Sequence, residues 1–171
     1  MNKASPYLSA FKTYWRVYGG WKALLLSPYF LFSLLFSVVL KPIWYDQFLN
    51  GVVWSEWALP IIPSMIAFSL AAMAIFLAIS NDRFLKLLRE GGKENSYLMK
   101  VMVAFFHFIF VQFFALGGCL LFVAFPSIVL SAIGFAIFIY ALSCGIAAAA
   151  ALLDVTEVLN ALGILDEFDD G

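Results

Sequence analysis

One long stretch without charge most constrains what this chain can fold into. Val101–Leu153 holds no Asp, Glu, Lys or Arg. Because a helix rises 1.5 Å per residue, about 20 apolar residues cross the hydrocarbon core of a bilayer. The stretch is too long for one crossing and fits two. It is interrupted at Ala124-Phe125-Pro126-Ser127, where a turn is expected, and it therefore predicts a transmembrane helical hairpin.

The composition extends this prediction to the whole chain. Of the 171 residues, 64% are hydrophobic and 12% are charged, against about 25% charged residues in ordinary soluble proteins. A soluble core cannot absorb so much apolar surface, so lipid must cover part of it. Cys119 and Cys144 both fall inside apolar segments, which favours small core residues over a disulfide or a metal ligand set.

The predicted fold class is an all-α, four-span transmembrane helical bundle with a short, amphipathic, acidic C-terminal helix. The expected spans cover residues of about 21–40, 58–80, 101–122 and 127–152. They form a domain over 23–153, between a basic and aromatic flank at 1–22 and an acidic tail at 154–171. The first span has no small-residue cleavage site after it, so we expect it to remain as an anchor.

Two segments outside the spans are rich in aromatic residues. In the flank, apolar side chains follow helical spacing from Tyr7 to Tyr18, which fits either a helix lying in the headgroup layer or an ordinary cytoplasmic flank with an aromatic belt. In the loop 41–57, Trp44, Tyr45, Trp54 and Trp57 indicate the water–lipid interface.

The distribution of cations predicts the orientation. The flank carries four Lys and Arg residues and the segment 81–100 carries five, whereas the loop 41–57 has one and the turn 124–126 has none. Since positive charge stays on the cytoplasmic side, both termini are expected there. The predicted location is the bacterial inner membrane.

Small residues recur at helical spacing on the second and fourth spans. Such faces let helices approach closely in lipid, so we interpret them as helix-packing or oligomer surfaces, with the second span at the buried centre of a bundle or at an oligomer seam. The members are Ala67, Ala71, Ala74 and Ala78 on the second span and Gly134, Ala141 and Gly145 on the fourth.

The spans offer little chemistry. They contain no carboxylate before Asp154 and a single histidine, so no acid–base pair or nucleophile with a base is available. We expect neither enzyme activity nor a cofactor or metal. His107 is the candidate for ion or substrate coupling, but we favour a histidine that is hydrogen-bonded to a neighbour or to interface water. Gln112 is expected to form an interhelical hydrogen bond.

The basic segment 81–100 and the acidic tail 154–171 are candidates for partner binding, because both are predicted on the cytoplasmic side. They could bind each other within or between protomers, the tail could dock a basic soluble protein, or both could simply be solvated. An apolar stripe along the tail favours a partner. The candidate residues are Asp154, Glu157, Asp166, Glu167, Asp169 and Asp170 in the tail and Arg83, Lys86 and Arg89 in the basic segment.

The stretch Ala58–Leu88 resembles uncharacterised bacterial four-span proteins in its Leu-Pro start, its small-residue span and its Asp82-Arg83-Phe84 exit. The size, the number of spans and the cytoplasmic termini also resemble the membrane subunit of the Kiwa anti-phage defence system. That resemblance implies an oligomeric inner-membrane sensor of infection that acts with a soluble, DNA-binding partner.

These observations predict a homo-oligomeric sensor or scaffold in the lipid bilayer that recruits or regulates a soluble cytoplasmic protein, without binding nucleic acid itself. The alternative is a small oligomeric ion channel or membrane-permeabilising effector. A transporter-like or assembly role comes third. A channel wall would have to come from the few polar residues of the spans, which are Ser64, Ser69, Ser131, Ser143 and Gln112.

Overall fold

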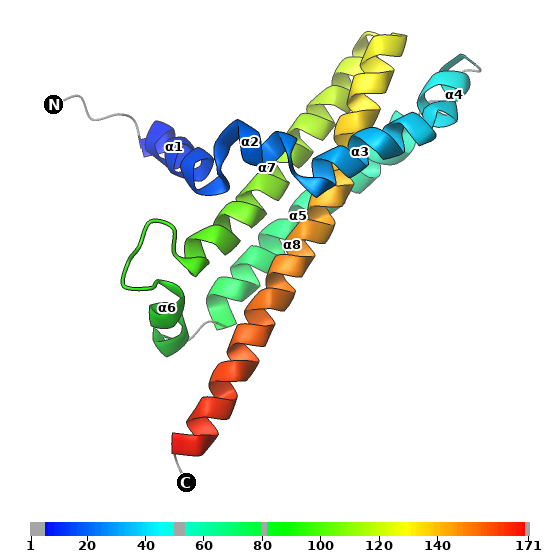
Figure 1. Cartoon of the computed structure of the whole chain (residues 1–171). Helices are drawn as coiled ribbons and strands as arrows, with labels where there is room; N and C mark the ends of the chain where they lie inside the picture. Colours follow the sequence, from blue (N-terminus) through cyan, green and yellow to red (C-terminus); the bar gives the residue numbers. More distant parts are fainter. Residues whose placement is uncertain (1–5, 50–53, 80–81, 170–171) are drawn as a thin grey trace, which may run out of the picture.

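The computed structural model describes residues 6–49, 54–79 and 82–169, and within them the chain is helical without any strand (Figure 1). This confirms the all-α class. The long helices are α5 (Ser55–Ile79), α7 (Tyr97–Ala124) and α8 (Ile128–Asp169). The shorter elements are α1 (Pro6–Tyr18), α2 (Gly20–Leu25), α3 (Pro28–Val39), a π-helical turn η1 (Pro42–Asp46), α4 (Gln47–Leu49) and α6 (Asp82–Leu88).

Three helices are long and apolar enough to cross a membrane, over Ser55–Ala78, Tyr97–Ala124 and Ile128–Val158. They correspond to the second, third and fourth predicted spans. The second begins at Ser55, earlier than expected, so Pro60 and Pro63 lie inside α5 and not at its start. Pro60 and Pro63 lack the N–H groups that would bond the carbonyls of Glu56 and Leu59, and prolines inside a helix are tolerated in lipid because neighbouring groups can satisfy such carbonyls.

The single helix expected over 21–40 is wrong, because this region forms two helices. Ser27 is extended, with φ −60° and ψ 128°, and Pro28 is the first residue of α3. A proline disfavours helical geometry in the residue before it, so α2 ends at Leu25. The 12 residues of α3 span about 18 Å, less than the roughly 30 Å of a hydrocarbon core. A fourth crossing would need α2 and α3 together.

The flank before this region forms the helix α1, and its position in the headgroup layer stays one of the two alternatives. Gly19 ends the helix in the left-handed region, with φ 99°, which glycine adopts without a steric cost. The chain therefore turns between α1 and α2, and α1 packs on α7.

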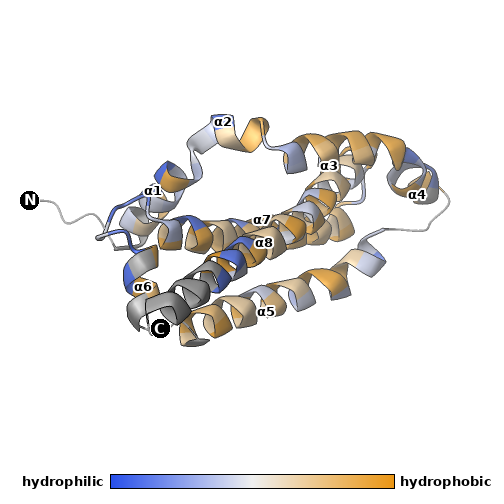
Figure 2. Ribbon diagram, turned by 60° about the horizontal axis from the view of Figure 1, so that its bottom comes forward, coloured by the Kyte–Doolittle hydropathy of each residue, from blue (hydrophilic) through white to orange (hydrophobic). Residues whose placement is uncertain are grey.

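The α7–α8 hairpin is the centre of the fold, with α5 on one side and α1 to α3 on the other (Figure 2). α5 packs mainly on α7, and α3 packs on α8. Ser33 and Ser37 are the buried residues of α3, and each hydroxyl donates to a carbonyl of its own helix at 2.7 Å. Small side chains one turn apart thus let α3 approach α8 closely.

α7 and α8 cross at two glycines. A Cβ on Gly118 would lie 3.5 Å from the Cα of Gly134, and a Cβ on Gly134 would lie 3.0 Å from the Trp54 ring. Trp54 is fully buried there and stacks on Phe122 with ring centroids 5.7 Å apart. The indole is therefore packed inside the bundle, where the missing Cβ of Gly134 leaves room for the ring, and its expected position at the water–lipid interface stays a prediction.

The separate C-terminal helix expected after the fourth span is also wrong. α8 is one helix of 42 residues, about 63 Å long. The run Ala147–Ala151 consists of strong helix formers, and no glycine or proline follows it before Gly163. The C-terminal turns of α8 extend beyond the ends of the neighbouring helices (Figure 1).

Candidate functional site

The principal polar contact inside the bundle joins three helices at His107. Its Nδ1 lies 2.7 Å from the Tyr14 hydroxyl of α1, and its Nε2 lies 2.8 Å from the Tyr140 hydroxyl of α8. A neutral imidazole has one N–H and one lone pair, so one hydroxyl donates to the ring and the other accepts from it. The ring is only 8% exposed. His107 is thus hydrogen-bonded to neighbours, the interpretation that the sequence favoured over coupling.

Tyr18 completes this cluster, which we call the His107 cluster (Tyr14, Tyr18, His107 and Tyr140). Its ring stacks on the imidazole with centroids 4.2 Å apart. Burial raises the pKa of Tyr14 and of Tyr18 above the ordinary value of a tyrosine, so both hydroxyls stay protonated at neutral pH. Every polar atom of the imidazole is paired, and the cluster fixes α1 against α7 and α8.

A cavity of about 750 Å³ lies beside the His107 cluster. Its rim is formed by α1 and α2, through Phe11, Lys12, Trp15, Arg16, Trp21 and Leu24. Its floor is formed by side chains of the His107 cluster and of the hairpin, which include Phe110, Val111, Phe114 and Ile137. The cavity therefore joins cations and tryptophans at one edge to an apolar interior.

The two cations of the rim differ in their partners. Arg16 forms an ion pair with Glu94, with Nη2 and Oε2 3.0 Å apart and both side chains exposed. Lys12 is exposed and has no acidic partner among the described residues. Since none of the lining residues is an aspartate or a glutamate, the cavity has a positive edge.

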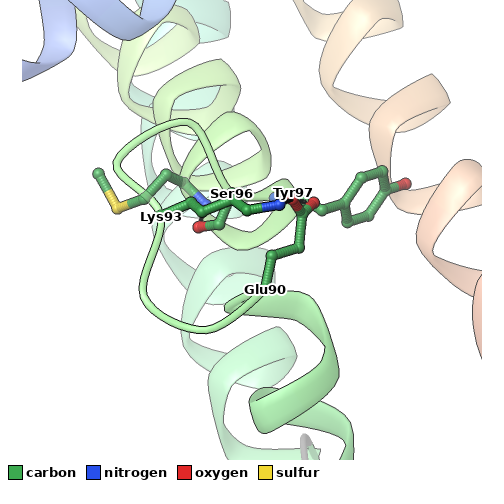
Figure 3. A network of polar contacts seen from close by, with 5 residues as sticks. Glu90, Lys93, Ser96 and Tyr97 are labelled. Atoms are coloured by element: carbon green, nitrogen blue, oxygen red, sulfur yellow. Dashed lines mark hydrogen bonds and ion pairs between the residues drawn. The ribbon is translucent and has the colours of Figure 1, made fainter.

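The same ion pair ties the flank to the segment that precedes α7. There the backbone N–H of Tyr97 donates to Glu90 over 3.1 Å, and Lys93 lies 3.7 Å from the same carboxylate. The Ser96 hydroxyl accepts from the Met99 N–H and caps α7. Figure 3 shows this turn closing the start of α7, with the Tyr97 ring directed toward α8. The cation-rich flank and the cation-rich segment 81–100 thus meet at one end of the bundle.

The cation-poor segments meet at the opposite end. The Ser131 hydroxyl donates to the Trp44 carbonyl at 2.7 Å and accepts from the Trp54 indole N–H at 3.0 Å. Phe48 contacts Phe122 near the end of α7, with ring centroids 5.8 Å apart. The described residues Trp44, Phe48 and Trp54 therefore lie near the α7–α8 turn, and most hydrophilic residues gather at the other end, near α6 (Figure 2).

The small-residue faces have two different environments. On α8, Gly134 and Ala141 are buried, and a Cβ on Gly145 would lie 3.1 Å from Phe108, so this face serves helix packing inside the chain. On α5 the small residues do not lie at the buried centre of the protomer, because α5 packs through its opposite side. Its exposed small residues are Ala67, Ala71, Ala74 and Ala78.

The described residues of the protomer do not supply the hydrogen bond expected for Gln112. The side chain is fully buried, and neither Nε2 nor Oε1 has a partner among the described residues. Ser69 and Ser143 are buried and donate to carbonyls of their own helices, and Ser131 belongs to the tryptophan contact. Ser64 is thus the one exposed residue among the five proposed for a channel wall.

The candidate partner-binding residues are only partly described. Asp154, Glu157, Lys86 and Arg89 are exposed, and none of them takes part in the Arg16–Glu94 or the Lys93–Glu90 ion pair. The side chains of Arg83, Asp166, Glu167, Asp169 and Asp170 lie outside the described residues. No group of three or more His, Cys, Asp or Glu side chains that could hold a metal occurs in the described part of the chain.

The sequence did not predict the tyrosines of the His107 cluster or the cavity. By its sequence position Tyr14 belongs to the aromatic flank and Tyr140 to an apolar span. The available signal was the unusual placement of a tyrosine and a histidine inside apolar segments, where a buried hydroxyl needs a partner. Comparisons with protein-family models, with curated proteins and with solved structures find no match to this chain.

Proposed function

We propose that this protein is an oligomeric inner-membrane sensor or scaffold that passes a signal to a soluble cytoplasmic protein. The observation that carries this proposal is the continuity of α8. One helix runs from the α7–α8 turn, past the His107 cluster, to exposed Asp154 and Glu157 and on to Asp169. Since a helix is stiff along its axis, a change in packing around Tyr140 is passed to the projecting end.

The chemistry of the projecting end suits a protein partner. Val155 is buried against the bundle, whereas Asp154, Thr156 and Glu157 are exposed. Acidic residues beside an apolar stripe favour a basic partner with an apolar patch. The tail residues Asp166, Glu167, Asp169 and Asp170 would add negative charge to such a surface.

The proposed topology places both termini in the cytoplasm. Its support is the separation of cations between the two ends of the bundle, with Lys12, Arg16 and the segment 81–100 at one end and Lys41 alone at the other. The path of α2 and α3 along the hairpin would supply the fourth crossing. The exposed small residues of α5 are the proposed seam between protomers.

The resemblance of Ala58–Leu88 to bacterial four-span proteins, and of the layout to the membrane subunit of the Kiwa system, suggests anti-phage defence as the setting. The signal would then be a change in the membrane during infection, and the partner would be a soluble DNA-binding subunit.

Site-specific photo-crosslinking in cells tests the proposal. A photoreactive residue at exposed Asn160 should capture one discrete cytoplasmic protein, whereas the same residue at Leu35, exposed on α3, should not. Truncation after Leu153 should leave the protein in the membrane and abolish recruitment. Retention of the partner by the truncated chain would contradict the docking surface.

The alternative of an oligomeric channel makes a different prediction. Purified protein in liposomes would conduct ions without any partner. Basal conductance well above that of protein-free liposomes would contradict a sensor without pore activity. With Ser64 as the exposed polar residue of the candidate wall, we expect no such conductance.

A further inference from the structure

We propose that the cavity between α1, α2 and the α7–α8 hairpin binds one anionic phospholipid, with the phosphate at Lys12 and Arg16 and an acyl chain along the floor. The inference rests on the membrane location proposed above. It adds a binding site and a ligand class to the scaffold role.

The size of the cavity suits an organic ligand. Its volume of about 750 Å³ lies within the range of about 300–1,000 Å³ that ligand sites occupy. On α7, the lining residues His107 and Phe114 are seven positions apart, so the floor extends about 10 Å along the helix. An extended apolar floor of this kind fits a chain better than a compact solute.

The polar groups of the floor already have hydrogen-bond partners and therefore need none from a ligand. Both nitrogens of His107 are already paired with the Tyr14 and Tyr140 hydroxyls. The floor therefore presents mostly ring faces and aliphatic carbon, from Phe110, Phe114 and Ile137. Burying an apolar chain there gains free energy without breaking a hydrogen bond.

The charged groups of the cavity lie at its rim, and they are positive. Lys12 and Arg16 are one helical turn apart on α1, and no carboxylate lines the cavity. Arg16 is shared with Glu94, so Lys12 supplies the charge without an acidic partner among the described residues. A phospholipid complements such a cavity, because its phosphate can bind the cations of the rim while its acyl chain lies on the apolar floor.

The mouth of the cavity has the residues of a lipid interface. Trp15 and Trp21 meet edge to face at its rim with ring centroids 4.9 Å apart, and Trp21 is 67% exposed. Leu25, the last residue of α2, and Leu26, which follows it, are also exposed. Tryptophans beside cations and exposed leucines favour a bilayer lipid over a second protein.

Tryptophan quenching by brominated phospholipids tests the site. The protein is reconstituted into phosphatidylcholine nanodiscs that contain brominated-chain phosphatidylglycerol or, at the same mole fraction, brominated-chain phosphatidylcholine. Quenching of the Trp15 and Trp21 emission, identified with the Trp15→Phe and Trp21→Phe variants, should be stronger with the anionic lipid. Aqueous glycerol phosphate should not relieve the quenching, which separates a lipid from a free phosphate.

Charge variants assign the headgroup site. Lys12→Gln should lower the preference for the anionic lipid about fivefold, and Lys12→Gln with Arg16→Gln should abolish it. Lys41→Gln is the matched control, because Lys41 lies over the Tyr45 ring outside the cavity. Glu94→Gln breaks the ion pair with Arg16 while it keeps the cation, and should leave the preference unchanged or raised.

The outcomes separate this proposal from the membrane location. Trp57, which is 40% exposed on α5, reports bilayer contact. If no tryptophan is quenched, the membrane location fails, and with it the site. If Trp57 is quenched but the cavity tryptophans are not, or if both lipids quench them equally, or if the preference survives loss of both cations, the lipid site is wrong and the scaffold role stands.

Discussion

The Tyr14 hydroxyl lies 2.7 Å from Nδ1 of His107, across 93 residues of sequence, and both groups are buried. Through this contact α1, which forms the flank, packs as part of the bundle. α1 is held by the hydrogen bond, by aromatic contacts of Phe11 with Phe110, and by the Arg16–Glu94 ion pair. The flank therefore forms a wall of the cavity.

Removal of the Tyr14 hydroxyl should weaken this attachment. Tyr14→Phe keeps the ring but leaves a nitrogen of His107 buried without a partner, which costs about 1–3 kcal/mol. We expect a lower thermal midpoint in detergent and faster proteolysis between α1 and α2. The matched control is Tyr29→Phe, because Tyr29 is half-buried and its hydroxyl has no partner among the described residues. Equal midpoints for the two variants would mean that the His107 contact contributes nothing.

The same tyrosines predict a loss of stability at alkaline pH. Burial raises the pKa of Tyr14 and Tyr18, so the folded chain holds these protons more tightly than the unfolded chain. Their contribution is complete below a pH of about 10 and is lost as the pH rises above it. The midpoint of the wild type should fall in that range, and Tyr14→Phe should flatten the fall. An identical pH dependence in both proteins would contradict this assignment.

The crossing of α7 and α8 predicts opposite effects on stability for two glycine-to-alanine substitutions. Gly134→Ala places a Cβ 3.0 Å from the buried Trp54 ring and 3.5 Å from the Gly118 carbonyl, and should cost about 1–3 kcal/mol of stability. Gly117→Ala meets nothing within 4 Å and should be neutral or stabilising by up to about 1 kcal/mol. Thermal unfolding of both variants in the same detergent checks the sign. A stable Gly134→Ala protein would contradict the tight crossing.

The fold could be predicted where local composition decides it. The charge-free stretch Val101–Leu153 predicts two helices because lipid demands that backbone groups pair within the helix. Composition does not show which side of a helix packs on the other helices of the chain and which side faces lipid. Trp54 and Trp57 belong to the same aromatic segment. Trp54 is nevertheless buried, because it packs at the crossing of Gly118 and Gly134, and local sequence cannot reveal a contact with residues so far along the chain. The His107 cluster likewise depends on contacts 93 and 33 residues apart, for which periodicity contains no information.

The exposed small residues of α5 predict the position of the oligomer seam. Ala71→Leu should change the oligomer size without unfolding the protomer, because the side chain is exposed. Ala149→Leu, at an exposed position of α8, is the control. Gly145→Leu should instead lower the stability of the protomer itself, because its side chain would meet Phe108 and Met65. Crosslinking in native membranes and mass photometry in detergent measure the size. An unchanged oligomer in Ala71→Leu would remove the seam from this face.

The unpaired amide of Gln112 predicts a substitution that raises stability. The side chain is fully buried in the bundle interior, with 0% of its surface accessible and neither polar atom paired among the described residues. Gln112→Met has nearly the same shape and removes the desolvation cost of the amide, so it should stabilise the protomer by about 1–3 kcal/mol. Ser131→Ala is the contrasting variant, because it removes a hydroxyl that bridges Trp54 and Trp44, and it should destabilise. If Gln112→Met lowers the thermal midpoint while the protomer remains folded, the amide has a partner in the assembled protein, and a second protomer becomes the first candidate to examine by crosslinking at that depth.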